Sequence, residues 1–201
     1  EKIAAPDERF AYTPESLGLP SDRGTRTALQ KLGYEHYLSQ RLPVFVYGTL
    51  RPGQGNSGIM EPAVVSVAKA ELRGVGIYGS NYGFPYAVEH PHPSAKVVGE
   101  IVYLEGSYEG DIARERLDRL EGFSSNHPSR SHYERVSMTC FIRGASGPPK
   151  EETVWTYMAR GHARDSLVED ERILDGDWVQ ARANHDASRY GENEQGADAR
   201  Q

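Results

Sequence analysis

The chain has 201 residues, of which 37% are hydrophobic and 26% charged, with a formal net charge of -6 and a single cysteine. This length suits one domain with extensions, and the negative charge argues against binding to nucleic acid or to anionic membranes, which needs clustered Lys and Arg. One cysteine excludes an internal disulfide, and no apolar run is long enough to span a membrane.

The first 41 residues are expected to form an extension ahead of the compact domain. Residues 1–24 carry three prolines among charged and small polar residues, which indicates an irregular arm. From Thr25 to Ser39 apolar side chains recur every three to four positions, as in a short amphipathic helix bent near Gly33. This helix either packs on its own domain or serves as a dimer contact, so we expect a monomer or a homodimer.

The compact domain, expected over residues 42–181, begins with a strand that ends abruptly. Val44 to Tyr47 are β-branched or aromatic, and the glycines and the proline between Gly48 and Gly53 force a turn. Free N–H groups after such a strand can form a concavity that suits a carboxylate or an oxyanion, and a glycine lets the backbone approach a ligand. The candidate ligand-binding residues are therefore Tyr47, Gly48, Thr49 and Leu50. An ordinary turn is the alternative.

Further strands follow this loop. Ala63–Tyr78 predicts a strand and a strongly bent or bulged neighbour, and Gly83–Val88 predicts an edge segment because Pro85 cannot donate to a central ladder. Val97–Leu104 predicts a strand whose one acid, Glu100, lies either on a solvated face or near a site. Two later strands are expected over Tyr133–Ile142 and Thr153–Met158.

One central helix is expected between these groups of strands. Asp111 offers an N-cap, and Gly122 is a natural residue to end the helix. Glu121 then falls in the last turn, where the helix dipole and any burial both disfavour a carboxylate, so its pKa should rise from about 4.3 toward neutrality. A carboxyl group of this kind can take and return a proton. A solvated surface glutamate is the alternative.

The remaining segments complete the fold class. A short helix is expected within residues 163–179, and residues 182–201 are polar enough to form a disordered tail. Strands, one central helix and more strands indicate an α+β domain with a mixed or antiparallel sheet that is curled or closed.

Five segments in order resemble the γ-glutamylcyclotransferase-like family, which includes γ-glutamylamine cyclotransferases and AIG2-like proteins. They are Val46–Gly53, Gly83–Pro85, Val98–Tyr103, Leu117–Phe123 and Tyr133–Val136, and the resemblance covers roughly residues 43–180. It implies a small β-barrel with packed helices. It also implies that Glu121 is catalytic, that the Tyr47–Leu50 backbone holds a glutamyl head, and that Tyr157 either lines the pocket or packs in the core.

The implied reaction needs no protein nucleophile. The α-amine of a γ-glutamyl amine or amide attacks its own γ-carbonyl, which closes 5-oxoproline and releases a free amine. We therefore expect a small-molecule γ-glutamyl substrate, no cofactor and no metal; His90 and His92 have no third ligand nearby. The alternatives are a non-catalytic module that binds a carboxylate, and a step that removes a γ-glutamyl group during biosynthesis. The leaving amine cannot be read from the sequence.

Other candidates are weaker. Cys140 lies among apolar residues and is expected to be a buried structural thiol. His127, Arg130 and His132 lie in a polar loop that either reaches over a site at the helix end or is solvated. The lack of a signal peptide favours a cytoplasmic protein, and the first residue, Glu1, leaves open a removed upstream segment.

Overall fold

A computed structural model describes residues 41–80, 82–92, 94–123, 131–144 and 148–186. The chain divides into a unit that ends at Leu42 and a second unit that begins at Pro43, and the second unit contains every strand found among the described residues. The helix expected from Thr25 to Ser39 lies outside the described residues. The domain boundaries expected at residues 42 and 181 therefore stay predictions.

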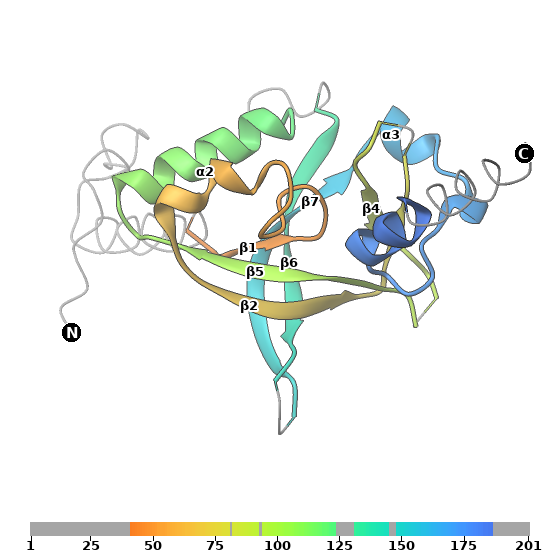
Figure 1. Cartoon of the computed structure of the whole chain (residues 1–201), viewed down its shortest axis with the longest axis horizontal. Coiled ribbons are helices and arrows are strands. Elements are labelled where there is room, and N and C mark those ends of the chain that lie inside the picture. The colour runs from red at the N-terminus through yellow and green to blue at the C-terminus, as the bar shows by residue number, and fades with distance from the viewer. Residues whose placement is uncertain (1–40, 81, 93, 124–130, 145–147, 187–201) are drawn as a thin grey trace, which may run out of the picture. The chain divides into compact units, whose positions relative to one another are not determined.

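Five strands close into a barrel (Figure 1). Around the barrel they are β1 (Val44–Val46), β5 (Lys96–Leu104), β2 (Val64–Arg73), β6 (Tyr133–Ile142) and β7 (Lys150–Ala159). Neighbouring strands run antiparallel, except that β7 returns to β1 in parallel with Val44 opposite Trp155. This mixed barrel, with helices in the same unit, confirms the α+β fold class.

The run from Ala63 to Tyr78 folds into a strand and a separate neighbour, as predicted. After β2 the chain turns at Gly74 into β3 (Val75–Tyr78), which leaves the barrel and pairs with β4 (Tyr86–Glu89) in a two-stranded sheet. The pairing of β2 with β5 shifts register between Val64 and Ser66, as a bulge does. The Gly83–Val88 stretch ends in β4, and Pro85 lies just before this strand, so its missing N–H removes no hydrogen bond from the sheet.

The strand β1 is buried on both faces, which explains its unbroken apolar sequence. Phe45 belongs to one core cluster with Leu72, Ile101 and Val154 from other barrel strands. Val44 and Val46 belong to a second cluster that includes Ala113 and Leu117 of α2 (Tyr108–Leu120). The helix α2 therefore packs over β1, and Leu50 of the loop that follows this strand belongs to the same cluster (Figure 1).

The start of α2 differs from the prediction. The helix begins at Tyr108 with Ser107 as its N-cap, so Asp111 is not the cap and instead lies in the first turn. A carboxylate there is favoured by the helix dipole. Shorter helical segments complete the unit: η3 (Ser57–Ile59), η4 (Glu61–Ala63), α3 (His162–Asp165) and η6 (Glu169–Glu171).

The segment Gly176–Trp178 leads into a final helix and holds its start. Residues 178–186 are helical, so the first residues of the tail expected over 182–201 are ordered as helix, and the rest lies outside the described residues. Asp177 caps this helix through its Oδ1, which accepts the N–H groups of Val179 and Gln180 at 3.2 and 3.3 Å. Trp178 is buried in the barrel core.

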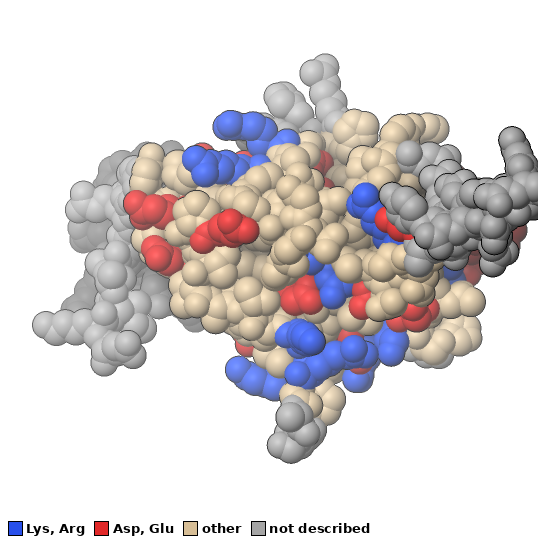
Figure 2. Space-filling model, viewed as in Figure 1, with Lys and Arg blue, Asp and Glu red and all other residues tan. Residues whose placement is uncertain are grey.

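Charges of both signs are interspersed on the face seen in Figure 2, with Lys and Arg gathered toward its lower edge. Some neighbouring charges pair directly: Glu71 of β2 accepts from Arg73 and lies 3.0 Å from Arg143. Among the helices in the described part of the chain, none combines the length and the apolar character needed to cross a bilayer.

Candidate active site

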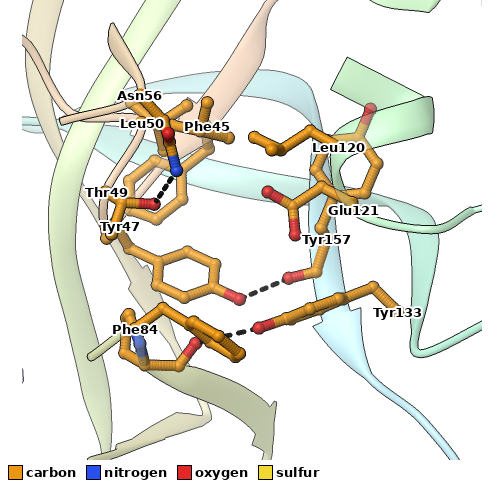
Figure 3. A pocket seen from close by; sticks show the side chains of 13 residues that line it. Phe45, Tyr47, Thr49, Leu50, Asn56, Phe84, Leu120, Glu121, Tyr133 and Tyr157 are labelled. Carbon is orange, nitrogen blue, oxygen red and sulfur yellow. Dashed lines mark hydrogen bonds between the residues drawn. The ribbon is translucent and has the colours of Figure 1, made fainter. Parts of the chain in front are cut away.

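A pocket of about 290 Å³ lies where the loop after β1 faces the end of α2 (Figure 3). The lining residues come from segments far apart in the sequence. They include every candidate from the sequence: Tyr47, Gly48, Thr49, Leu50, Glu121 and Tyr157. The structure also brings Phe84, Pro85, Leu120, Tyr133 and Asn56 to the same pocket, and of these only Asn56 lies outside the five segments that the sequence singled out.

Glu121 is held at the C-cap of α2 by the way the helix ends. Gly122 has φ +61°, a left-handed conformation that glycine adopts without strain. The N–H of Gly122 donates to the carbonyl of Arg119 at 3.3 Å, and the N–H of Phe123 donates to that of Asp118 at 2.8 Å. These two bonds are the Schellman arrangement, which stops the helix sharply and fixes the direction of the residue before the glycine.

The side chain of Glu121 points into the pocket (Figure 3). Burial raises the pKa of this carboxyl from its ordinary value of 4.5 to about 7. The direction agrees with the sequence prediction, and the cause is removal from water by the surrounding walls. A glutamate with this pKa exchanges its proton near neutral pH, which is the property a general acid and base needs.

The loop opposite Glu121 is a tight turn. The N–H of Arg51 donates to the carbonyl of Gly48 at 3.0 Å, which places Thr49 and Leu50 at the two central positions. Within the described part of the chain, the N–H groups of Thr49 and Leu50 donate to no backbone carbonyl. Asn56 steadies the turn, because its amide donates to the hydroxyl of Thr49 at 2.9 Å and its N–H to the carbonyl of the same residue.

Arg51 anchors this turn to the rest of the barrel. Its guanidinium donates twice to Glu100 of β5, at 2.7 and 2.9 Å, and once to Asp177 at 2.6 Å. The side chains of Arg51 and Glu100 are only 12% exposed, so the ion pair is largely shielded from water. Glu100 is thus near the site through Arg51. No signal in the sequence indicated this partnership, because the three residues are far apart in the chain.

Gly48 has a close neighbour that the sequence did not predict. A β-carbon at this position would lie 2.7 Å from the ring of Pro85, so a side chain collides with the segment that forms the opposite pocket wall. The prediction was that glycine lets the backbone approach a ligand. The structure adds that glycine lets Pro85 approach the loop.

Three tyrosine hydroxyls tie the pocket walls together. The hydroxyl of Tyr47 donates to the carbonyl of Tyr157 at 2.6 Å, and that of Tyr133 donates to the carbonyl of Pro85 at 3.2 Å. The hydroxyl of Tyr157 donates to Asp118 at 2.7 Å, and Asp118 also accepts from Arg135 at 2.8 Å. Burial, then the nearby Glu121 charge, raises the pKa of Tyr47, so its hydroxyl stays protonated.

Tyr157 satisfies both interpretations that the sequence left open, since it lines the pocket and is buried in the core. Cys140 is fully buried, and burial raises the pKa of its thiol to about 12, as expected for a structural cysteine. His127 and Arg130 lie outside the described residues. No group of three or more His, Cys, Asp or Glu side chains gathers into a metal site within the described ranges.

Comparison with known proteins decides the family. Residues 44–180 match the family described as "Gamma-glutamyl cyclotransferase, AIG2-like". The chain belongs to this family. A relative from Niallia circulans, named "Gamma-L-glutamyl-butirosin B gamma-glutamyl cyclotransferase", is 29% identical over 142 residues, which are 71% of this chain and 78% of the relative. These two matches support a cyclotransferase-like enzyme.

Solved structures of low sequence identity also resemble this member of the gamma-glutamyl cyclotransferase, AIG2-like family. An AIG2-like protein from Mus musculus is 20% identical, with a TM-score of 0.40 over 65% of this chain and 81% of that one. An uncharacterised protein from Pyrococcus horikoshii is 20% identical, with a TM-score of 0.46 over 73% of this chain and 97% of that one.

Proposed function

We propose that this chain converts a γ-glutamyl amine or amide into 5-oxoproline and a free amine, with Glu121 as the proton carrier. One observation carries the proposal: the carboxyl of Glu121, with a pKa of about 7, faces the turn after β1 across a single pocket. Family membership supports the same reaction class. An acid–base group and a backbone turn are the two parts that an intramolecular cyclisation requires.

Glu121 would act twice in each turnover. As a carboxylate it takes a proton from the substrate's α-ammonium, which frees the nitrogen lone pair to attack the γ-carbonyl carbon. The new C–N bond closes the ring, and Glu121 returns its proton to the leaving nitrogen as the old C–N bond breaks. The second proton lost by the ring nitrogen passes to Glu121 and on to the released amine, so atoms and charge balance.

The turn after β1 would hold the glutamyl head. The N–H groups of Thr49 and Leu50 sit at the central positions of the turn, where they are left for a carboxylate or for the developing oxyanion. Arg51 contributes indirectly, because its bonds to Glu100 and Asp177 keep the turn in place. Preorganised donors of this kind stabilise an oxyanion without rearranging during the reaction.

The name of the Niallia circulans relative favours one alternative, removal of a γ-glutamyl group from a larger metabolite. That reaction uses the same cyclisation and differs only in the leaving amine. A non-catalytic binding module remains the other hypothesis. The raised pKa of Glu121 favours an enzyme over it, since binding a carboxylate ligand gains nothing from an acidic side chain in the pocket.

The test is to incubate the protein with a panel of γ-glutamyl amides and dipeptides and to follow 5-oxoproline and the released amine. Glu121→Gln keeps the size of the side chain and should lower kcat by at least about a hundredfold, with little change in substrate affinity. No 5-oxoproline from any substrate would favour the binding module. The absence of a cofactor or metal, the cytoplasmic location and the monomeric or homodimeric state stay predictions.

A further inference from the structure

A second and larger cavity adjoins the pocket at Glu121. It has a volume of about 770 Å³, and four residues line both cavities: Phe84, Leu120, Glu121 and Tyr133. Ligand cavities in proteins span roughly 300–1,000 Å³, so the first pocket is near the lower limit and the second near the upper one. The first suits a small head group, and the second has room for something considerably larger.

The proposed mechanism decides which part of the substrate enters which cavity. Glu121 must reach both the α-amine and the leaving nitrogen, so the bond that breaks lies at the junction. The turn after β1 lines only the smaller cavity, which assigns the glutamyl head to that side. The leaving amine then extends into the larger cavity.

One wall of the larger cavity is a continuous row of aromatic rings. Tyr82 stacks on Phe84 at 5.8 Å, Phe84 meets Tyr86 edge to face at 5.5 Å, and Tyr86 stacks on Tyr133 at 5.5 Å. Tyr82 is 77% exposed, so the outer end of the row is open to a ligand. Aromatic rows of this kind favour another ring or a flat apolar group laid against them.

The polar part of the lining is basic. Among the described residues that line this cavity, Glu121 is the one acid, whereas Arg160, His132 and His162 are N–H donors. The N–H of Arg160 donates to the carbonyl of His132 at 3.1 Å, so these two residues lie together. The guanidinium forms an ion pair with Glu134 at 3.9 Å, which is too long for a hydrogen bond, and the arginine side chain is 41% exposed. The parallel N–H donors of the Arg160 guanidinium match the two oxygens of a carboxylate.

Resting on the proposed function, we infer that the leaving amine carries both an aromatic ring and an anionic group, as the amine of an aromatic amino acid does. The ring lies against Tyr82, Phe84 and Tyr86, and the anionic group is bound by Arg160. This substrate class differs from a polycationic amine, because Arg160 repels added positive charge, although an aromatic row alone would accept a cation.

The experiment compares four substrates by the rate of 5-oxoproline formation. γ-Glutamyl-phenylalanine has the ring and the carboxylate, γ-glutamyl-phenethylamine only the ring, γ-glutamyl-alanine only the carboxylate, and γ-glutamyl-putrescine a cation. We expect kcat/KM for the phenylalanine derivative to exceed that for the alanine derivative by about tenfold to a hundredfold. It should exceed that for the phenethylamine derivative by about five- to tenfold.

Arg160→Gln should remove the second preference, so that the phenylalanine and phenethylamine derivatives react at similar kcat/KM. Arg164→Gln is the matched control: it removes the same charge from an exposed arginine that lines neither cavity, and the preference should remain. Equal rates for all four substrates, or fastest reaction of the putrescine derivative, would overturn the inference and leave the proposed function intact. No 5-oxoproline from any substrate would overturn both.

Discussion

The partly buried carboxyl of Glu121 should make the fold less stable as the pH rises. Its pKa is raised from 4.5 to about 7, so between these values the folded protein holds a proton that the unfolded chain has lost. The free energy of unfolding therefore falls over this range, and the loss is complete above about pH 7. At 1.36 kcal/mol for each pKa unit, the change is at most about 3 kcal/mol.

Replacing Glu121 by Gln removes this pH dependence, because the amide is neutral at every pH. Urea unfolding of the two proteins at pH 5 and pH 8 measures the effect. The free energy of unfolding of Glu121→Gln, minus that of the wild type, should be about 2–3 kcal/mol larger at pH 8 than at pH 5. The variant should thus be the more stable protein at pH 8 while it is nearly inactive.

Glu115→Gln provides the matched control. Glu115 is exposed on the same helix, so the same chemical change there should shift the difference between pH 5 and pH 8 by no more than a few tenths of a kcal/mol. If Glu121→Gln behaves like Glu115→Gln, the pocket does not withdraw the Glu121 carboxyl from water. The acid–base role would then lose its physical basis.

Three further predictions concern the same pocket. The value of kcat/KM should rise with pH through a midpoint near 7 as Glu121 ionises, and a midpoint near 4.5 would contradict the raised pKa. Gly48→Ala should raise KM by about tenfold or more, because the new β-carbon lies 2.7 Å from the ring of Pro85. Gly55→Ala is the control: a β-carbon there meets nothing within 4 Å, so KM should not change. Arg51→Gln leaves the shielded carboxylate of Glu100 without its partner, so it should lower the free energy of unfolding by about 2–4 kcal/mol in urea titrations. A loss below about 1 kcal/mol would show that the Arg51–Glu100 pair is solvated.

The parts of the fold that depend on neighbours in sequence could be predicted. The apolar run of β1 predicted a buried strand, and Gly122 predicted the end of α2, because both are local signals. The start of α2 was missed, because the helix begins after Ser107, whose side chain makes no capping hydrogen bond, and this leaves no local capping signal at that position.

The parts of the site that depend on distant residues could not be predicted. The sequence marked Glu100 as near a site or solvated but named no partner for it, yet the closure of the barrel brings Glu100 and Asp177 within hydrogen-bond distance of the Arg51 guanidinium. The contact of Gly48 with Pro85 likewise joins two segments that only the fold brings together. The family resemblance included both segments without giving a reason for their pairing.

Glu121 combines a local cause with a distant one. The sequence placed it at the C-terminal end of a helix, where the dipole and any burial both disfavour a carboxylate, and this indicated the correct direction for its pKa. In the structure the cause is burial, and the walls that bury it come from the loop after β1, the Phe84–Pro85 segment, β6 and β7. A helix end can therefore position an acid by local chemistry, whereas its proton affinity depends on the whole barrel. It follows that changes to wall residues outside the helix, such as Tyr133, should alter the pKa of Glu121 without changing its helix.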